Sequence, residues 1–219
     1  MRILALDTST PCLSAGLYEN DRPVWEHHDE GFGGHAERLA SVLQRALRGR
    51  RIPDRIAVGI GPGSFTGLRV GVATAQALGY AYDRPVVGIS SLEAAWWAEG
   101  CVRPMEVLAD ARRGRAYVCR IGVRGRPSRP VLETRDAAGP VEGVSRLWVG
   151  TPAPEWGSPR GADAALSRLA RGVARAASKA ALSRERKPVV PLYVLAKDCN
   201  VTLGGSARRT LSSLAGGSR

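Results

Sequence analysis

Two short segments carry residue types that could bind a phosphate group. The first is the turn Asp7-Thr8-Ser9-Thr10, which places one carboxylate and three hydroxyl groups after a short apolar run. The second is the glycine loop from Gly61 to Gly67 (GPGSFTG), which precedes an apolar segment. Backbone N–H groups in such a loop can bind an anion. The alternatives are an ordinary Asx or Ser/Thr turn and a tight strand-to-helix connection.

Neither segment matches a standard nucleotide motif in full. The glycine loop lacks the Gly-Lys-Ser/Thr of a Walker A motif, and Thr66 stands where a dinucleotide fingerprint requires glycine. The only histidines, His27, His28 and His35, form no His-x-x-x-His pair, and no Ser-His-Asp set is evident by motif. The sequence therefore predicts no metal site and no catalytic residue.

Arginines supply most of the net charge of +12. Residues 160–219 hold 12 basic and 3 acidic residues, and the basic segment from Arg112 to Arg129 holds seven arginines and no carboxylate. Clustered cations favour an anionic partner, nucleic acid first, because binding displaces condensed counterions. The alternative is a solvated surface in a protein of arginine-rich codon usage, since only three of the 32 basic residues are lysines.

Apolar periodicity and turn residues predict the elements that position these segments. Strands are expected at 3–7, 13–18, 23–28, 55–60, 86–89, 105–109, 116–123, 130–134 and 189–195. Helices are expected at 35–48, 65–81, from Ser90 or Ser91 to Trp97, and at 162–178, with a Pro/Gly-rich loop at 150–161. We predict two α/β lobes, 1–103 and 104–203, followed by a basic Gly/Ser-rich tail, 204–219, that we expect to be disordered.

Composition bounds the class of protein. A chain of 219 residues fits one large or two small domains. No apolar run approaches the roughly 18 residues of a membrane span, and Ile3–Leu6 is too short for the core of a signal peptide. The four cysteines lie far apart, which favours free thiols. We therefore expect a soluble, cytoplasmic protein.

The segment from Phe65 to Ala81 is apolar nearly all round, with Arg69 as its one charged residue. Such a helix must be covered on both sides. A sheet can cover one side, and more of this chain or another subunit must cover the other. Gly63, Gly67 and Gly71 recur every four residues and would let another backbone approach closely. We predict a subunit interface on this helix, while the sequence leaves open which face looks outward.

Five segments in order over about residues 1–120 resemble the TsaB (YeaZ) family: ILALDTST, HAERL, AVGIGPGSFTGLRVGVATAQAL, VVGISSLEA and LADARRGRAYV. From Arg124 to Gly204 the likeness is loose and rests on Pro191-Leu192-Tyr193-Val194. The resemblance implies an actin-like ATPase (ASKHA) fold, with two lobes of mixed sheet plus helices and a shortened second lobe.

The resemblance also implies a function in tRNA modification. The family is the partner subunit of TsaD, which transfers the threonylcarbamoyl group to adenosine 37 of tRNA (t6A). TsaD binds its metal with a His-x-x-x-His pair, whereas here Leu39 stands four residues after His35. The chain is therefore expected to be a non-catalytic scaffold that activates TsaD. The alternative is a stand-alone enzyme of actin-like fold, a kinase or a glycoprotease-type peptidase.

Partners and cofactors follow from the same resemblance. The expected partners are TsaD in a heterodimer, the TsaE ATPase, a second copy of the chain in a homodimer when TsaD is absent, and tRNA through the complex. ATP and a metal ion are expected on the partner subunits. The chain itself is expected to bind ATP weakly or not at all, because it shows no lysine or carboxylate set for Mg²⁺-phosphate.

The resemblance assigns roles residue by residue. The first two helices are expected to bundle with those of the partner, which makes the interface candidates His35, Arg38, Leu39, Val42, Leu68, Gly71, Val72 and Ala75. The candidates for a vestigial nucleotide site are Asp7, Thr8, Ser9, Thr10, Gly61, Gly63 and Ser64. The clusters of basic charge, rather than the resemblance, make Arg112, Arg113, Arg115, Arg208 and Arg209 the candidates for tRNA contact.

Overall fold

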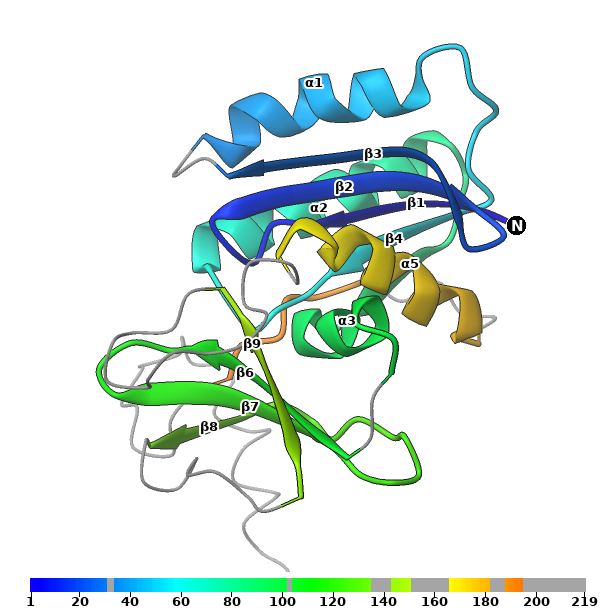
Figure 1. Cartoon of the computed structure of the whole chain (residues 1–219). Helices are drawn as coiled ribbons and strands as arrows, with labels where there is room; N and C mark the ends of the chain where they lie inside the picture. The colour runs from blue at the N-terminus through cyan, green and yellow to red at the C-terminus, as the bar shows by residue number, and fades with distance from the viewer. Residues whose placement is uncertain (31–33, 102–103, 135–142, 151–165, 182–187, 195–219) are drawn as a thin grey trace, which may run out of the picture.

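The computed structural model describes residues 1–30, 34–101, 104–134, 143–150, 166–181 and 188–194. Its strands form two sheets (Figure 1). The first has the order β3-β2-β1-β4-β5, with β1 at Arg2–Asp7, β2 at Cys12–Glu19, β3 at Arg22–Glu30, β4 at Arg55–Gly59 and β5 at Val86–Ile89. The second has the order β8-β7-β6-β9, with β6 at Met105–Asp110, β7 at Arg115–Ile121, β8 at Val131–Thr134 and β9 at Ser145–Val149.

The second sheet repeats the strand plan of the first. In the first sheet β1, β2 and β3 are antiparallel neighbours and β4 lies parallel to β1; β6, β7, β8 and β9 are arranged in the same way. The turns repeat as well. The first strand of each sheet ends at an aspartate, and its Oδ1 accepts the N–H two residues on, Asp7 from Ser9 and Asp110 from Arg112. The chain is thus built from two related mixed α/β units.

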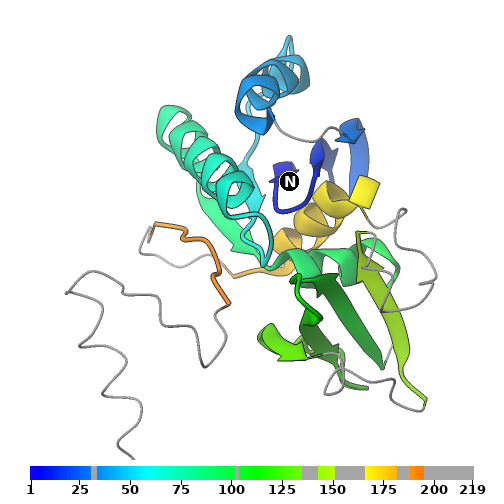
Figure 2. The same cartoon turned by 90° about the vertical axis from the view of Figure 1, so that its left-hand side faces the viewer.

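Helices cover both faces of the first sheet (Figures 1 and 2). Helices α1 (His35–Leu47) and α2 (Phe65–Ala81) pack on one face with Leu4 and Leu6 of β1, while α3 (Ser91–Ala98) and α5 (Leu169–Lys179) pack on the other with Ile3 and Ala5. Successive residues of a strand point to opposite faces. Strand β1 is therefore apolar without interruption from Ile3 to Leu6 because both of its faces are buried.

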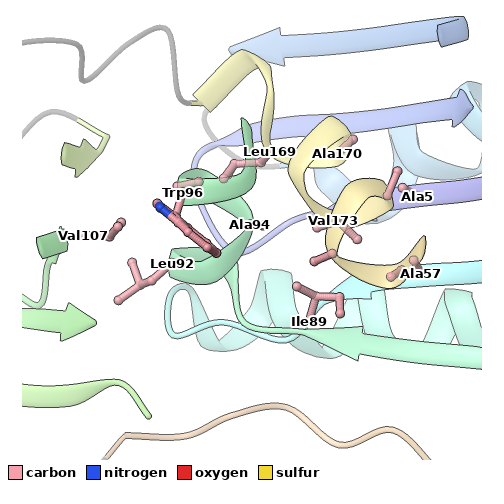
Figure 3. Packing of buried hydrophobic residues seen from close by; sticks show 14 of the residues in the cluster. Ala5, Ala57, Ile89, Leu92, Ala94, Trp96, Val107, Leu169, Ala170 and Val173 are labelled. Carbon is pink, nitrogen blue, oxygen red and sulfur yellow. The ribbon is translucent and has the colours of Figure 1, made fainter. Parts of the chain in front are cut away.

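The core between the sheets is centred on α3 and α5 (Figure 3). Trp96 of α3 is fully buried, and Val173 of α5 lies in the same cluster as Val107 of the second sheet. A Cβ at Gly172 would lie only 1.8 Å from the carbonyl oxygen of Ala94, so this glycine lets the two helix backbones touch. Helix α5 follows the second sheet in sequence but returns to pack on β1, β2 and β4.

Polar contacts fix α5 to the first sheet. The buried Arg55 of β4 donates to the carbonyl oxygens of Ala177 and Ala180 at the end of α5. Arg171 of α5 donates to both carboxylate oxygens of Glu26, and the Tyr18 hydroxyl donates to the same carboxylate at 3.0 Å. Burial, with the adjacent Glu26 carboxylate, raises the pKa of Tyr18. The lobe boundary expected at residue 103 stays a prediction, but α5 packs on the first lobe rather than within the second.

Most of the expected elements form, with three differences. Strand β9 was not predicted. The strand expected at 189–195 does not form in the described residues 188–194, where prolines 188 and 191 lack an N–H and the Leu192 N–H donates to Ile60. The helix expected at 162–178 is observed as α5 from Leu169, and residues 162–165 lie outside the described ranges.

Two further expectations concern the class of protein. None of the helices in the described ranges is long and apolar enough to cross a membrane. Cys12, Cys101 and Cys119 are free thiols, while Cys199 lies outside the described residues. Burial raises the pKa of Cys119 to about 11, so this thiol is not activated.

We predict that Gly172→Ala destabilises the chain by about 1–3 kcal/mol, because the added methyl group must push α5 away from Ala94. Helix propensity alone would favour alanine by roughly 0.5–1 kcal/mol. Urea unfolding followed by circular dichroism measures the change. Gly122→Ala is the control, since no atom lies within 4 Å of its Cβ position. A Gly172→Ala protein as stable as wild type would contradict the packing described.

Candidate functional site

The turn after β1 is buried inside the chain. Asp7 and Thr8 have no exposed surface, and Ser9 is only 2% exposed. Oδ1 of Asp7 accepts from the Ser9 N–H at 2.8 Å and from its hydroxyl at 2.6 Å, and Oδ2 accepts from the Ser91 hydroxyl at 2.7 Å. The carboxylate is therefore already bound by hydrogen-bond donors of the chain itself.

The glycines of the α2 segment face this turn. A Cβ at Gly63 would lie 2.2 Å from the carbonyl oxygen of Ser9, and one at Gly67 would lie 2.0 Å from that of Thr8. At Gly71 the conflict is with Oγ1 of Thr8, also at 2.2 Å. The close backbone approach that the glycine spacing predicts is confirmed, and the approaching backbone is that of the chain's own Thr8-Ser9.

Hydrogen bonds complete the closure of the glycine loop. The Ser64 N–H donates to the Ser9 carbonyl at 2.7 Å, and the Thr8 hydroxyl donates to the Gly67 carbonyl at 2.7 Å. The N–H of Gly61 donates to the Ser91 hydroxyl, and that of Gly67 donates to the side chain of Ser64, the N-cap of α2. The N–H groups of Gly61, Ser64 and Gly67, which could face a phosphate in a phosphate-binding loop, are used within the chain.

Six of the eight expected interface residues are buried within the chain. Leu68, Val72 and Ala75 are at most 4% exposed and Gly71 is buried, all on the side of α2 that faces the sheet and the turn. On α1, Leu39 and Val42 are likewise at most 2% exposed and lie in the core; Arg38 is half-buried and paired with Asp29; and His35 is the first residue of the helix. The apolar periodicity of Leu39, Val42, Leu68, Val72 and Ala75 thus follows the core face of these helices, and the role of the eight residues in an interface stays a prediction.

The solvent-facing side of α2 carries a different set of apolar residues. Phe65 is 58% exposed and Tyr80 is 92% exposed, with exposed alanines between them along the helix. We call this surface the α2 outer face; it consists of Phe65, Ala73, Ala77, Tyr80 and Ala81. Sequence reasoning missed these residues, although the glycine row, by marking the face of closest backbone approach, carried the signal that could have found them.

The segment 188–194 runs beside α2 and extends this surface. Gln76 of α2 donates to the Val189 carbonyl at 2.5 Å, and the Leu192 N–H donates to the Ile60 carbonyl at 2.7 Å. The ring centroids of Tyr193 and Phe65 lie 5.3 Å apart. The Arg69 guanidinium lies over the Phe65 ring, 5.3 Å from its centroid. The outer face is therefore bordered by an exposed aromatic pair.

No group of three or more histidine, cysteine, aspartate or glutamate residues that could hold a metal ion is found among the residues with described positions.

His27 on β3 stacks on Trp25, and burial together with the nearby Arg45 lowers its pKa. Its Nε2 is buried without a hydrogen-bond partner, which fits a neutral ring packed under α1.

The candidate arginines fall in two places. Arg112, Arg113 and Arg115 lie in or next to the turn between β6 and β7, where Arg112 and Arg113 have positive φ angles of 63° and 56°. Arg208 and Arg209 lie outside the described residues. The structure thus brings Asp7–Thr10 and the glycine loop together. Arg112, Arg113 and Arg115 are not part of that site, because they lie at the second sheet.

Comparison with known proteins assigns the family. A family profile described as "TsaD: tRNA N6-adenosine threonylcarbamoyltransferase" matches residues 32–140. Proteins named "tRNA threonylcarbamoyladenosine biosynthesis protein TsaB" from Escherichia coli (strain K12) and Bacillus subtilis (strain 168) are 38% and 33% identical over 125 residues, each match covering 53% of this chain and 53% of the relative. The structure of YeaZ from Pseudomonas aeruginosa matches with a TM-score of 0.67 and 26% identity, over 88% of this chain and 99% of that one.

The chain belongs to the TsaB/YeaZ family. The predicted actin-like (ASKHA) fold of two mixed α/β units is confirmed by the match to YeaZ and by the repeated strand plan. The sequence match spans about half the length of the curated TsaB relatives. The activity and partners of the whole TsaB protein are therefore matters for proposal.

We predict that the isolated chain does not bind Mg²⁺-ATP with a low-micromolar dissociation constant. Phosphate binding at the turn would have to break the hydrogen bonds that Asp7, Thr8 and Ser9 make within the chain, leaving buried polar groups unpaired at roughly 1–3 kcal/mol each. Isothermal titration calorimetry measures the affinity, with an ATP-binding protein titrated from the same stock as positive control. A low-micromolar dissociation constant would show that the turn opens.

Proposed function

We propose that this chain is a non-catalytic subunit that binds a TsaD-type transferase and supports its modification of tRNA to t6A. The observation that carries the proposal is the pairing of two features on opposite sides of α2. One side closes the nucleotide-site remnant with the chain's own turn, and the other exposes an apolar surface. The names of the relatives support the pathway, since both are called t6A biosynthesis proteins.

The remnant supports a scaffold rather than an enzyme. Asp7 is the one carboxylate in the turn, and it is fully buried with hydrogen bonds to Ser9 and Ser91. A kinase or phosphatase needs its carboxylate and its loop N–H groups free to meet phosphate or metal. In this chain the same groups hold the turn, α2 and the start of α3 together.

The α2 outer face supports a helical partner. Tyrosine and phenylalanine at its two ends supply the aromatic anchors that are enriched in protein interfaces. Ala73 and Ala77 between them leave room for another helix to approach closely. The proposed occupant is the matching helix of TsaD in a heterodimer, or of a second copy of the chain in a homodimer. TsaE and tRNA would join through the complex.

Reconstitution tests the function. The full chain is combined with TsaD, TsaE, ATP, threonylcarbamoyl donor and an ANN-decoding tRNA, and t6A is measured by mass spectrometry of the digested tRNA. The proposal expects t6A with all three proteins and a loss when this chain is omitted. Threonylcarbamoyl transfer, sugar phosphorylation or peptide cleavage by the chain alone would contradict the proposal and favour a stand-alone enzyme.

We predict that Ala77→Arg weakens binding to TsaD by two to three decades. An unpaired charge buried in an interface costs about 3–5 kcal/mol, and each 1.4 kcal/mol is about tenfold in affinity. The site is exposed in the free chain and alanine to arginine keeps helix propensity, so folding is preserved. Surface plasmon resonance against immobilised TsaD measures the affinity.

Val131→Arg is the matched control for this prediction. It adds the same charge at an exposed apolar residue on β8 of the second sheet, away from α2. Equal affinities for the Ala77→Arg protein and wild type would place the docking surface elsewhere.

Gly71→Arg is unsuitable as a probe of the α2 interface, because the added side chain would collide with Thr8 and disturb the fold.

A further inference from the structure

The arginines of the basic segment Arg112–Arg129 differ in whether they have a counter-ion. Arg120 on β7 is bound by Glu106 at 2.9 Å and by Glu133 at 2.6 Å, and these contacts raise its pKa. Among the residues that the structure describes, the other six have neither an ion pair nor a side-chain hydrogen bond; they are Arg112, Arg113, Arg115, Arg124, Arg126 and Arg129. Within the described residues, Arg120 is thus the one arginine of the segment held by carboxylates, and the other six make no such contact.

The described carboxylates near these six side chains make no ion pair with them. Glu106 is only 2% exposed and is shared by Arg120 and Arg146. Glu133 is taken by Arg120, and Asp110 accepts the backbone N–H of Arg112. The positive charge of the segment is therefore available to an outside anion.

The fold divides the six arginines between the two ends of β7. Arg112, Arg113 and Arg115 lie at the β6–β7 turn, and the other three lie in the connection from β7 to β8. All are exposed except Arg115, which is half-buried. Arg124 and Arg126 lie beyond the far end of β7, a strand that spans about 20 Å, whereas Arg129 lies beside the strand because Ser128 is hydrogen-bonded to Arg120.

Backbone hydrogen bonds hold both ends in place. At the first end, the Ala111 N–H donates to the Arg115 carbonyl at 2.9 Å, and the Asp110 carboxylate accepts a hydrogen bond from the Arg112 N–H. At the second end, the Ser128 N–H donates to the Arg120 carbonyl at 2.8 Å, and the Ser128 hydroxyl accepts from the Arg120 N–H at 2.9 Å. The arginines therefore project from ordered turns rather than from a loose chain.

We propose that these two ends bind the phosphate backbone of duplex RNA. Guanidinium groups match phosphate oxygens in a bidentate geometry, and the β7 span of about 20 Å corresponds to roughly six phosphates along one strand. Single-stranded nucleic acid is bound through aromatic stacking, and neither turn contains Phe, Tyr or Trp. The surface therefore contacts phosphates and does not read bases.

The inference rests on the proposed function only for the identity of the RNA, which would be a tRNA stem. Binding to an RNA duplex of unrelated sequence needs neither TsaD nor TsaE. Failure of the RNA proposal and failure of the scaffold proposal therefore give separate results.

The test measures binding of the full chain to a fluorescent RNA duplex of about 20 base pairs at several salt concentrations. With six phosphate contacts, the slope of log K against log salt is expected near −5, since each contact contributes about 0.9. One variant carries Arg112→Gln, Arg113→Gln and Arg115→Gln; a second carries Arg124→Gln, Arg126→Gln and Arg129→Gln. Each is expected to reduce the magnitude of the slope by about 2 to 3.

A matched control removes the same charge elsewhere. It replaces Arg22, Arg48 and Arg84 with Gln, three exposed arginines of the first lobe that have no ion pair within the described part of the chain. The proposal expects the control to keep the wild-type slope. An equal loss in the control, unchanged slopes in both end variants, or binding to phosphatidylserine vesicles without binding to RNA would overturn it.

Discussion

The contact of the Thr8-Ser9 backbone with the glycine row of α2 is the constraint on which the rest of the structure depends. Gly63, Gly67 and Gly71 would each bring a Cβ within 2.2 Å of this turn. The contact therefore fixes the rotation of α2, because only its glycine side can face the turn. Fixing that rotation packs the glycine loop against the turn after β1 and, on the opposite side, turns Ala77 and Tyr80 toward solvent.

Contacts of the turn after β1 and of helix α5 link the two sheets. Ser91 at the start of α3 donates to Asp7, so the turn after β1 is tied to the helix that packs against the second sheet. Helix α5 returns from the second sheet to the first and meets α3 at Gly172, where the backbones touch. The buried turn after β1 and the contact of α3 with α5 thus hold the two sheets together.

Local pattern was sufficient to predict the strands of the first sheet, helices α1 and α2, and the close approach at the glycine row. Apolar periodicity did not indicate which face of α2 is buried, because a helix that is apolar all round has no polar side to mark; the glycine row carried that signal. Strand β9 is defined by its parallel pairing with β6, a contact between distant segments. Likewise, the seven arginines of the segment Arg112–Arg129 differ in role only once β7 separates them in space and Glu106 and Glu133 bind Arg120.

Hydrogen–deuterium exchange of the full chain, alone, with TsaD and with Mg²⁺-ATP, tests most directly whether the chain binds a partner through α2 while its nucleotide-site remnant stays closed. The account predicts that TsaD slows exchange in peptides covering 69–81 and 188–194. It also predicts that ATP leaves peptides covering 6–10 and 61–68 unchanged. Slower exchange at 6–10 with ATP, or no change in α2 with TsaD, would contradict the account.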